Sequence, residues 1–237
     1  IPMRVGLDSD GREFGYNLRI QIDQDEVRHE GDLYMSVIEA LAGKSLESYA
    51  NLPVLDLARN TVQSLNIHAP YIVAHPGGGS NPGMQMDSKR YPPDSLAEVL
   101  NRVAGATSAQ VILIGGPKDG ELAKAVEHQL SVESVSLVGE LSFTEIGALA
   151  EKSLLYIGND TGLTHVASAV GARTVMMMGP TDPRRYAPYT QNSLALWKPV
   201  DLKTGGVATA HSQAWDWSRD GIAVDDAVAQ ILEFIGR

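Results

Sequence analysis

The chain contains no cysteine among its 237 residues. Disulfides, thiolate metal sites and a cysteine nucleophile are therefore excluded, and a reducing compartment is compatible with this composition. Basic residues are also scarce, because 19 Lys and Arg stand against 29 Asp and Glu, for a net charge of −10. A nucleic-acid binder needs a basic footprint, so this balance argues against a nucleic-acid partner.

Long apolar runs are absent too. No stretch approaches the roughly 18 residues that a membrane span requires. The beginning, IPMRVGLDSDG, has neither the basic nor the apolar region of a secretory signal. We therefore expect neither a membrane span nor a secretion signal in this sequence. Because the net charge repels anions, an anionic ligand must be held by local amides and a few cations.

From residue 71 onward, short apolar runs alternate with longer segments of helical periodicity. This pattern is typical of βαβ units on a parallel sheet and predicts a Rossmann-like α/β fold. The expected strands are 71–75, 110–115, 134–139, 154–158 and 174–179, and the expected helices are 92–104, 121–130, 142–152 and 161–170. Their strand-to-helix turns fall at the carboxyl edge of the sheet, where such folds bind ligands.

The first 66 residues have a different pattern. They contain a strand-like run at 4–7, a helix at 29–41 and a connection of mixed polarity at 51–66. This is too little for an independent domain. We therefore predict a partial domain with an interdomain linker at 1–66, and a Rossmann-like domain at 67–237 that ends in an amphipathic helix.

The segment GNDTGLTHVASAVGA carries the sharpest functional signal. It places Gly162 at the opening of a helix, where free backbone amides and the helix dipole favour a phosphate. Thr161 and His165 are four residues apart and Asp160 precedes them, so all three side chains can face one ligand. The set suits a sugar nucleotide, with Thr161 on the diphosphate, His165 on a phosphate or ribose oxygen and Asp160 on sugar hydroxyls. The alternative is that Asp160 caps the helix and His165 belongs to the core.

A second signal is HPGGGSNPGMQMDSKRYP, in which a glycine run follows the first expected strand. Glycines allow backbone amides to wrap an anion. Lys89 would add a point charge that neutralises a leaving diphosphate. The alternative for Lys89 is an ordinary surface lysine.

Two further turns carry charged residues. Asp119, in GGPKDGE, follows a strand at a position where a carboxylate can accept from ribose hydroxyls, although simple helix capping explains it equally well. Asp182, Arg184 and Arg185, in GPTDPRRYAP, would lie at the sheet edge and face either an acidic acceptor or, as we slightly favour, an interdomain surface.

Other patterns are better explained by structure than by chemistry. Asp8 and Asp10 in LDSDG imitate a metal-binding pair but fit a turn, and the six histidines lack the spacing of a ligand set, so we expect no metal. The run Met176–Met178 lies in an expected strand and is interpreted as core. No cofactor is expected.

The four turns, taken in order, resemble glycosyltransferase family 9, whose members include the heptosyltransferases of the lipopolysaccharide core. The segments RVGLDSDGREFGYN and HEGDLYMSVIEAL also resemble the end of that family's N-terminal domain. The resemblance implies the GT-B architecture of two Rossmann-like domains. Residues 1–66 would then be a remnant of the acceptor domain, and residues 67–237 the domain that binds the nucleotide-sugar donor.

The activity that the resemblance implies is transfer of heptose from an ADP-activated donor to the lipid A-core oligosaccharide, without metal and with inversion. The resemblance also implies a cytoplasmic enzyme whose contact with the inner membrane is at most peripheral. Its general base would be an aspartate upstream of residue 1, so this chain is expected to bind donor without turning it over. The donor-binding residues carried over are Gly78, Gly79, Ser80, Lys89, Asp119, Leu141, Asp160, Thr161, Gly162 and His165, with Leu141 as a wall for adenine. The glycine loop is longer than expected of the family, which leaves the sugar open, and only one of Gly78, Gly79 and Ser80 would contact a phosphate.

Two alternatives remain at this point. The chain could be a module that binds a nucleotide sugar without catalysis, or part of another GT-B enzyme such as a sugar-nucleotide epimerase. An epimerase would convert a free nucleotide sugar without an acceptor, which distinguishes it from a transferase.

Overall fold

The computed structural model describes residues 2–9, 11, 13–23, 26–47, 49–81, 84–200 and 215–236. Its main feature is a six-stranded parallel sheet in the order β10-β9-β8-β3-β6-β7. The strands are β3 (Tyr71–His75), β6 (Gln110–Leu113), β7 (Ser134–Ser136), β8 (Leu155–Asn159), β9 (Thr174–Met177) and β10 (Ser193–Leu196). The five strands predicted beyond residue 70 are confirmed. β10 was not predicted, because it is a short edge strand whose residues are mostly half-exposed.

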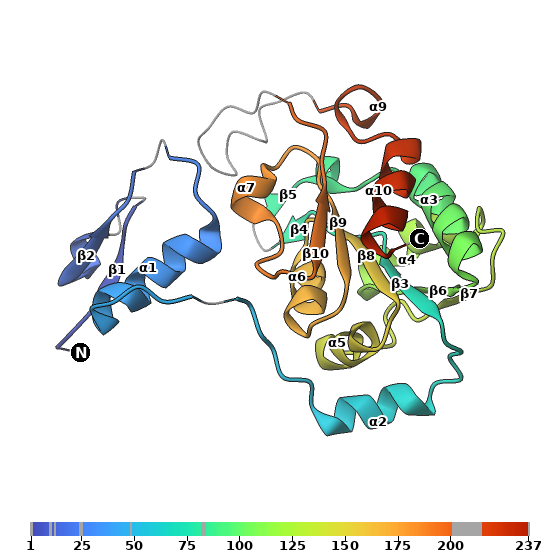
Figure 1. Ribbon diagram of the computed structural model, residues 1–237, viewed down its shortest axis with the longest axis horizontal. Helices are drawn as coiled ribbons and strands as arrows, with labels where there is room; N and C mark the ends of the chain where they lie inside the picture. Colours follow the sequence, from blue (N-terminus) through green and yellow to red (C-terminus); the bar gives the residue numbers. More distant parts are fainter. Residues whose placement is uncertain are drawn as a thin grey trace.

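Helices cover both faces of this sheet (Figure 1). One face is covered by α3 (Pro93–Thr107), α4 (Gly120–Glu127) and α10 (Val224–Phe234), and the other by α5 (Phe143–Glu151) and α6 (Gly162–Ala169). Successive strand residues point to opposite faces, so Ile72 packs in one core and Val73 in the other. A parallel sheet covered on both faces needs apolar residues at nearly every strand position, which explains the continuous apolar runs.

Local signals fix where several helices begin. Ser142 caps α5, with its hydroxyl accepting from the Glu145 N–H while the Glu145 carboxylate accepts from the Ser142 N–H at 2.7 Å. This confirms the capping box that the sequence predicts. Pro93 occupies the first position of α3, where its missing N–H costs nothing. The Met176–Met178 run is fully buried, as predicted.

A helix precedes the first strand of the sheet, in the segment 51–66 that was predicted to be a plain connection. This helix, α2 (Asp56–Ser64), packs on α5, and the Arg59 guanidinium bonds both carboxylate oxygens of Glu151, at 3.0 and 2.7 Å. Val62 and Leu65 pack against the core beneath α5. The predicted domain boundary after residue 66 therefore falls beyond a helix that already packs on the sheet domain.

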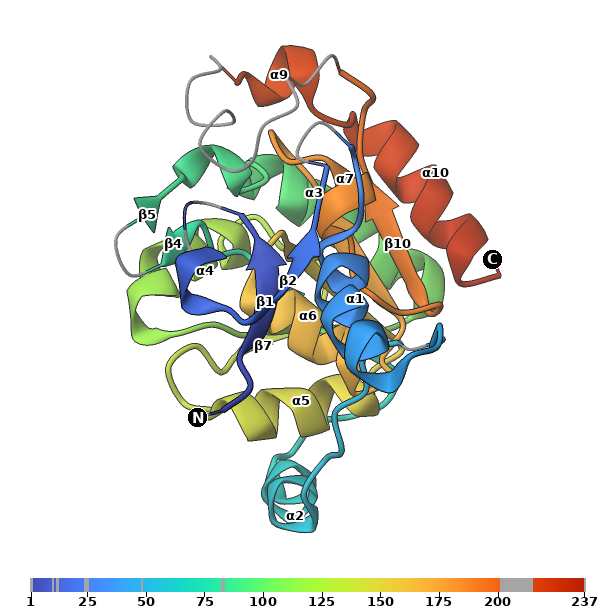
Figure 2. The same ribbon diagram turned by 90° about the vertical axis from the view of Figure 1, so that its left-hand side faces the viewer.

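The first part of the chain forms a small separate arrangement. Strands β1 (Val5–Asp8) and β2 (Leu18–Gln21) pair in parallel and are followed by α1 (Glu30–Ala42). Figure 2 shows β1, β2 and α1 in front of the sheet domain, with α2 below α5. Asp8 accepts a hydrogen bond from Gln21, and Asp10 lies outside the described residues. No helix in the described part of the chain is both long and apolar enough to span a membrane.

The remaining elements lie in loops around the sheet, except for η1 (Glu13–Gly15), which lies between β1 and β2. The others are β4 (Ser80–Asn81), β5 (Met84–Gln85), η2 (Asp87–Lys89), η3 (Pro117–Asp119), α7 (Pro183–Tyr186) and α9 (Trp217–Asp220). Counted from β3, the sheet order corresponds to the Rossmann order 3-2-1-4-5-6. Its switch point, where ligands bind in such folds, lies between β3 and β8.

Candidate functional site

The four turns that the sequence singles out follow four neighbouring strands. The glycine loop follows β3, the GGPKDGE turn follows β6, the GNDTG turn follows β8 and the GPTDP turn follows β9. These strands are adjacent in the order β9-β8-β3-β6 and all run in the same direction. The prediction that the turns meet at one sheet edge is therefore confirmed.

Asp160 is the most deeply placed carboxylate of this edge, with a side chain only 8% exposed. Its Oδ2 accepts from the Lys89 ammonium at 2.6 Å and from the Thr181 hydroxyl at 2.8 Å. Lys89 is itself only 12% exposed, so it is not an ordinary surface lysine. Nor does Asp160 cap α6, since Thr161 is the N-cap and makes no side-chain capping bond. A buried carboxylate needs such partners to remain charged.

His165 lies beside the free oxygen of that carboxylate. Its Nε2 is 4.0 Å from Asp160 Oδ1, and its side chain is 43% exposed, so it is not a core histidine. Partial burial lowers the pKa of the His165 imidazole, Asp160 opposes this effect, and the charges of His29 and Lys89 add to it. The ring therefore favours its neutral form at neutral pH, with one nitrogen donating and the other accepting.

The first turn of α6 offers backbone N–H groups at the same edge. The first N–H groups of any helix have no partner within it, and Gly162 occupies the first position of this one. A Cβ built on Gly162 would meet no atom within 4 Å, so open space lies directly above it. This is the geometry in which a helix N-terminus can receive an anion.

The glycine loop passes close over this turn. Gly78 and Gly79 have φ values of 116° and 72°, which side chains rarely adopt. A Cβ on Gly78 would lie 2.0 Å from the Thr161 methyl group. The Arg90 Nε donates to the Gly78 carbonyl at 2.7 Å and so holds the loop down. Ser80 begins β4, which pairs with β5.

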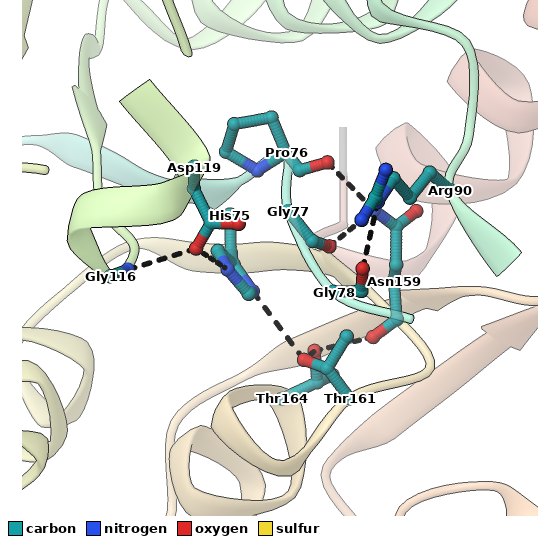
Figure 3. Close-up of polar contacts among 10 residues, drawn as sticks. All are labelled: His75, Pro76, Gly77, Gly78, Arg90, Gly116, Asp119, Asn159, Thr161 and Thr164. Carbon is teal, nitrogen blue, oxygen red and sulfur yellow. Dashed lines mark hydrogen bonds and ion pairs between the residues drawn. The ribbon is translucent and has the colours of Figure 1, made fainter. Parts of the chain in front are cut away.

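Behind the loop lies a polar network that joins three of the turns (Figure 3). His75, the last residue of β3, has its Nε2 3.3 Å from Asp119 Oδ2 and its Nδ1 3.4 Å from Thr161 Oγ1. Asp119 also accepts from the Gly116 N–H at 2.9 Å. The capping alternative for Asp119 is thus partly realised, and the same carboxylate faces the imidazole.

Asn159 completes the network from the neighbouring strand. Its amide nitrogen donates to the carbonyls of Pro76 and Gly77, at 3.1 and 2.9 Å, and its oxygen accepts from the Tyr91 N–H at 2.9 Å. Both ends of the glycine loop are therefore tied to the end of β8. The Trp217 indole supports the same loop from outside by donating to the Ser88 carbonyl at 2.9 Å.

The other predicted residues lie at the margins of the candidate site. Leu141 is half-buried against the core beneath α5. Asp182 caps α7 by accepting from the Arg184 N–H at 2.9 Å. Arg185 pairs at 2.6 Å with Glu30 of α1, which agrees with the favoured interdomain interpretation of this turn. Which of the predicted residues contact a ligand stays a prediction.

Sequence reasoning did not select His75, Asn159, Thr181 or Arg90. Two of them carried a usable signal, because His75 and Asn159 are polar residues that end otherwise apolar buried strands. Such residues must find hydrogen-bond partners at the sheet edge. Thr181 carried no comparable signal. Among the described residues, no group of three or more His, Asp or Glu gathers as a metal site would require.

Proteins of similar sequence include lipopolysaccharide heptosyltransferases. Lipopolysaccharide heptosyltransferase 3 of Escherichia coli K12 is 28% identical over 142 residues, which cover 59% of this chain and 39% of that protein. Lipopolysaccharide heptosyltransferase 2 of the same strain is 30% identical over 124 residues, covering 51% and 34%. The chain thus matches well under half of the length of these relatives.

Solved structures agree on the fold. A family 9 glycosyltransferase from Veillonella parvula superposes with a TM-score of 0.80 at 20% identity, covering 99% of this chain and 67% of that one. The E. coli ADP-heptose lipopolysaccharide heptosyltransferase II superposes with a TM-score of 0.72 at 19% identity, covering 99% and 70%. Both support the α/β architecture of GT-B type. The model of glycosyltransferase family 9 (heptosyltransferase) matches residues 1–206, and this chain belongs to that family.

Proposed function

We propose that this chain carries the donor-binding site of a heptosyltransferase that uses an ADP-activated heptose. The observation that carries the proposal is the buried Lys89–Asp160 pair beside the N-terminus of α6. It places a cation, a carboxylate and free backbone amides at the switch point of a Rossmann-like sheet. Those are the groups that a sugar diphosphate needs for its phosphates and its hydroxyls.

The two oxygens of Asp160 have different tasks in this proposal. Oδ2 is occupied by Lys89 and Thr181, which orient the carboxylate. Oδ1 faces His165 across 4.0 Å, too far for a direct hydrogen bond. A hydroxyl placed between them would donate to Oδ1 and accept from the imidazole. A sugar hydroxyl of the donor fits that position.

Transfer would be a direct displacement. The bond between the sugar anomeric carbon and the phosphate oxygen breaks, an acceptor oxygen bonds that carbon from the opposite side, and a base removes the acceptor proton. ADP leaves with the bonding electrons. The Lys89 ammonium and the α6 amides stabilise the charge that develops on the departing diphosphate. With this cation in place, we propose that no metal ion is needed.

The comparisons support the identity of the ligands. One relative is described as an ADP-heptose lipopolysaccharide heptosyltransferase. Another, the E. coli heptosyltransferase WaaC, was solved with ADP and superposes with a TM-score of 0.63 at 19% identity. From these we infer an ADP-sugar donor and a lipopolysaccharide acceptor. None of the residues of the proposed donor site is assigned as the general base. The acceptor step is therefore proposed for the whole enzyme.

Calorimetric titration of the chain with ADP, UDP and GDP tests the donor assignment. We expect ADP to bind most tightly and chelation of metals to leave its affinity unchanged. Lys89→Ala should weaken ADP binding by about tenfold, because it removes a charge-assisted hydrogen bond. Asp160→Asn should weaken an ADP-sugar more than ADP. Lys124→Ala, at an exposed lysine of α4, is the matched control and should change nothing.

Other outcomes would redirect the assignment. Tighter binding of UDP or GDP would exclude ADP as the donor nucleotide. Conversion of a free nucleotide sugar without any acceptor would indicate an epimerase. ADP binding equal in Lys89→Ala and Lys124→Ala would place the diphosphate elsewhere.

A further inference from the structure

His75 is a buried side chain of the polar network that contacts two candidate ligand-binding residues from different turns (Figure 3). It is 3% exposed, so it lies beneath the surface that a ligand would meet. Asp119, on its Nε2 side, comes from the turn after β6, and Thr161, on its Nδ1 side, comes from the turn after β8. The imidazole therefore spans the two turns that flank β3.

The charge of Asp119 settles which imidazole nitrogen carries the proton. Burial alone would raise the pKa of Asp119, but the hydrogen bonds from His75 and from the Gly116 amide, together with the charge of Arg90, hold it below its ordinary value. An ionised carboxylate only accepts, so His75 Nε2–H donates to it. In the neutral ring Nδ1 is then the acceptor, and the Thr161 hydroxyl donates to it.

This arrangement fixes the orientation of Thr161. With the hydroxyl turned inward to His75, its methyl group faces Gly78, where a Cβ would stand 2.0 Å away. The hydroxyl also lies 3.4 Å from Thr164 Oγ1, whose own proton goes to the Asn159 carbonyl at 2.6 Å. The backbone of Thr161 and the start of α6 are consequently held in one position relative to Asp119.

We propose that His75 is a positioning residue that couples the two parts of the donor site. Through it the carboxylate of Asp119, on the ribose side, sets the orientation of Thr161, on the diphosphate side. The two turns then bind a nucleoside diphosphate cooperatively. This inference rests on the proposed donor site and adds to it a residue that does not touch the ligand.

Each of two His75 variants keeps one of the two hydrogen bonds that His75 makes, to Asp119 or to Thr161. In His75→Gln the amide nitrogen reaches the Nε2 position and can still donate to Asp119. In His75→Asn the amide oxygen occupies the Nδ1 position and can still accept from Thr161. Each is combined with Asp119→Asn and with Thr161→Val, which keeps the shape of Thr161, and ADP affinity is measured by calorimetry. Urea denaturation shows which variants are folded under the binding conditions.

The expected pattern is reciprocal. With His75 present, Asp119→Asn and Thr161→Val should each weaken ADP binding several-fold. The affinity loss of the double variant should differ about threefold or more from the product of the two single-variant losses. Asp119→Asn should cost more affinity in His75→Gln than in His75→Asn, and Thr161→Val should cost more in His75→Asn than in His75→Gln. In both His75 variants the effects of the two substitutions on ADP affinity should be independent, so that the double loss equals the product of the single losses.

A merely structural role would not produce this pattern. If both His75 variants responded equally to both second substitutions, or if the deviation persisted without His75, the coupling role would be overturned while the donor site stood. If the unsubstituted chain bound no nucleotide, the donor site itself would be overturned and this role with it.

Discussion

The helices α1 and α3 are similar in length but lie in very different surroundings. α3, in the sheet domain, buries seven residues, including Leu100 and Val103. α1, in the N-terminal region, buries none, and its residues Tyr34, Ile38 and Leu41 are about half exposed or more. Helical periodicity alone therefore does not reveal whether a helix has a core to pack on.

The N-terminal region instead contacts the sheet domain through polar groups at the start of α1. His29 caps the helix, stacks on the Tyr189 ring with 4.8 Å between centroids, and bonds the Ala187 carbonyl at 2.8 Å. Glu30 pairs with Arg185, and Asp32 accepts from the Tyr189 hydroxyl at 2.5 Å. One region is thus stabilised by apolar burial, and the other is attached by a junction of hydrogen bonds and ion pairs.

The largest effect should come from the same substitution made in the two helices. Leu100→Ala removes a fully buried side chain and should lower the free energy of unfolding by about 2–5 kcal/mol. Leu41→Ala, at a side chain that is 51% exposed, should change it by no more than about 0.5 kcal/mol. Urea denaturation measures both. Similar losses would mean that α1 is part of the cooperative core.

A smaller effect should come from the junction. Tyr189→Phe removes the hydrogen bond to Asp32, which also raises the pKa of Tyr189 to about 12. The loss should be about 1 kcal/mol or less, and it should appear as faster amide hydrogen exchange in residues 30–42 while exchange in β3 and β8 is unchanged. Arg102→Gln, which breaks an exposed ion pair within the sheet domain, is the control. Faster exchange in the sheet would show that the regions unfold together.

The smallest effect should be on the pH dependence of ADP affinity, because residues of both regions influence the pKa of His165. The charge of His29 is among the causes that lower the His165 pKa, after the larger effect of burial. A bound diphosphate favours the protonated ring, so ADP affinity should rise a few-fold as pH falls below about 6.5. In His165→Gln only the titration of ADP itself should remain. An identical pH profile in both proteins would show that a bound diphosphate does not shift the pKa of His165.

Sequence reasoning predicted the parallel sheet, the four turns at its carboxyl edge and most of the polar residues in those turns. Apolar periodicity and glycine-rich turns are local signals, so the sequence alone reveals them. Sequence reasoning did not predict Thr181 or the pairing of Lys89 with Asp160, because these residues come from segments distant along the chain. Contacts of this kind depend on tertiary packing and leave no local pattern. The helix α2 did leave one, because Ala58, Val62 and Leu65 follow one another at helical spacing, and the interpretation of 51–66 as a plain connection overlooked it.

The Lys89–Asp160 pair has a consequence for what the site retains after reaction. Without ligand the two charges compensate each other at 2.6 Å. A diphosphate that draws the ammonium away leaves the carboxylate of Asp160 short of a donor, and a sugar hydroxyl can replace the lost bond only while the sugar is attached. Spent nucleotide lacks that hydroxyl, so the carboxylate competes with it for Lys89. The pair would thereby favour the loaded donor over the spent nucleotide and hasten product release.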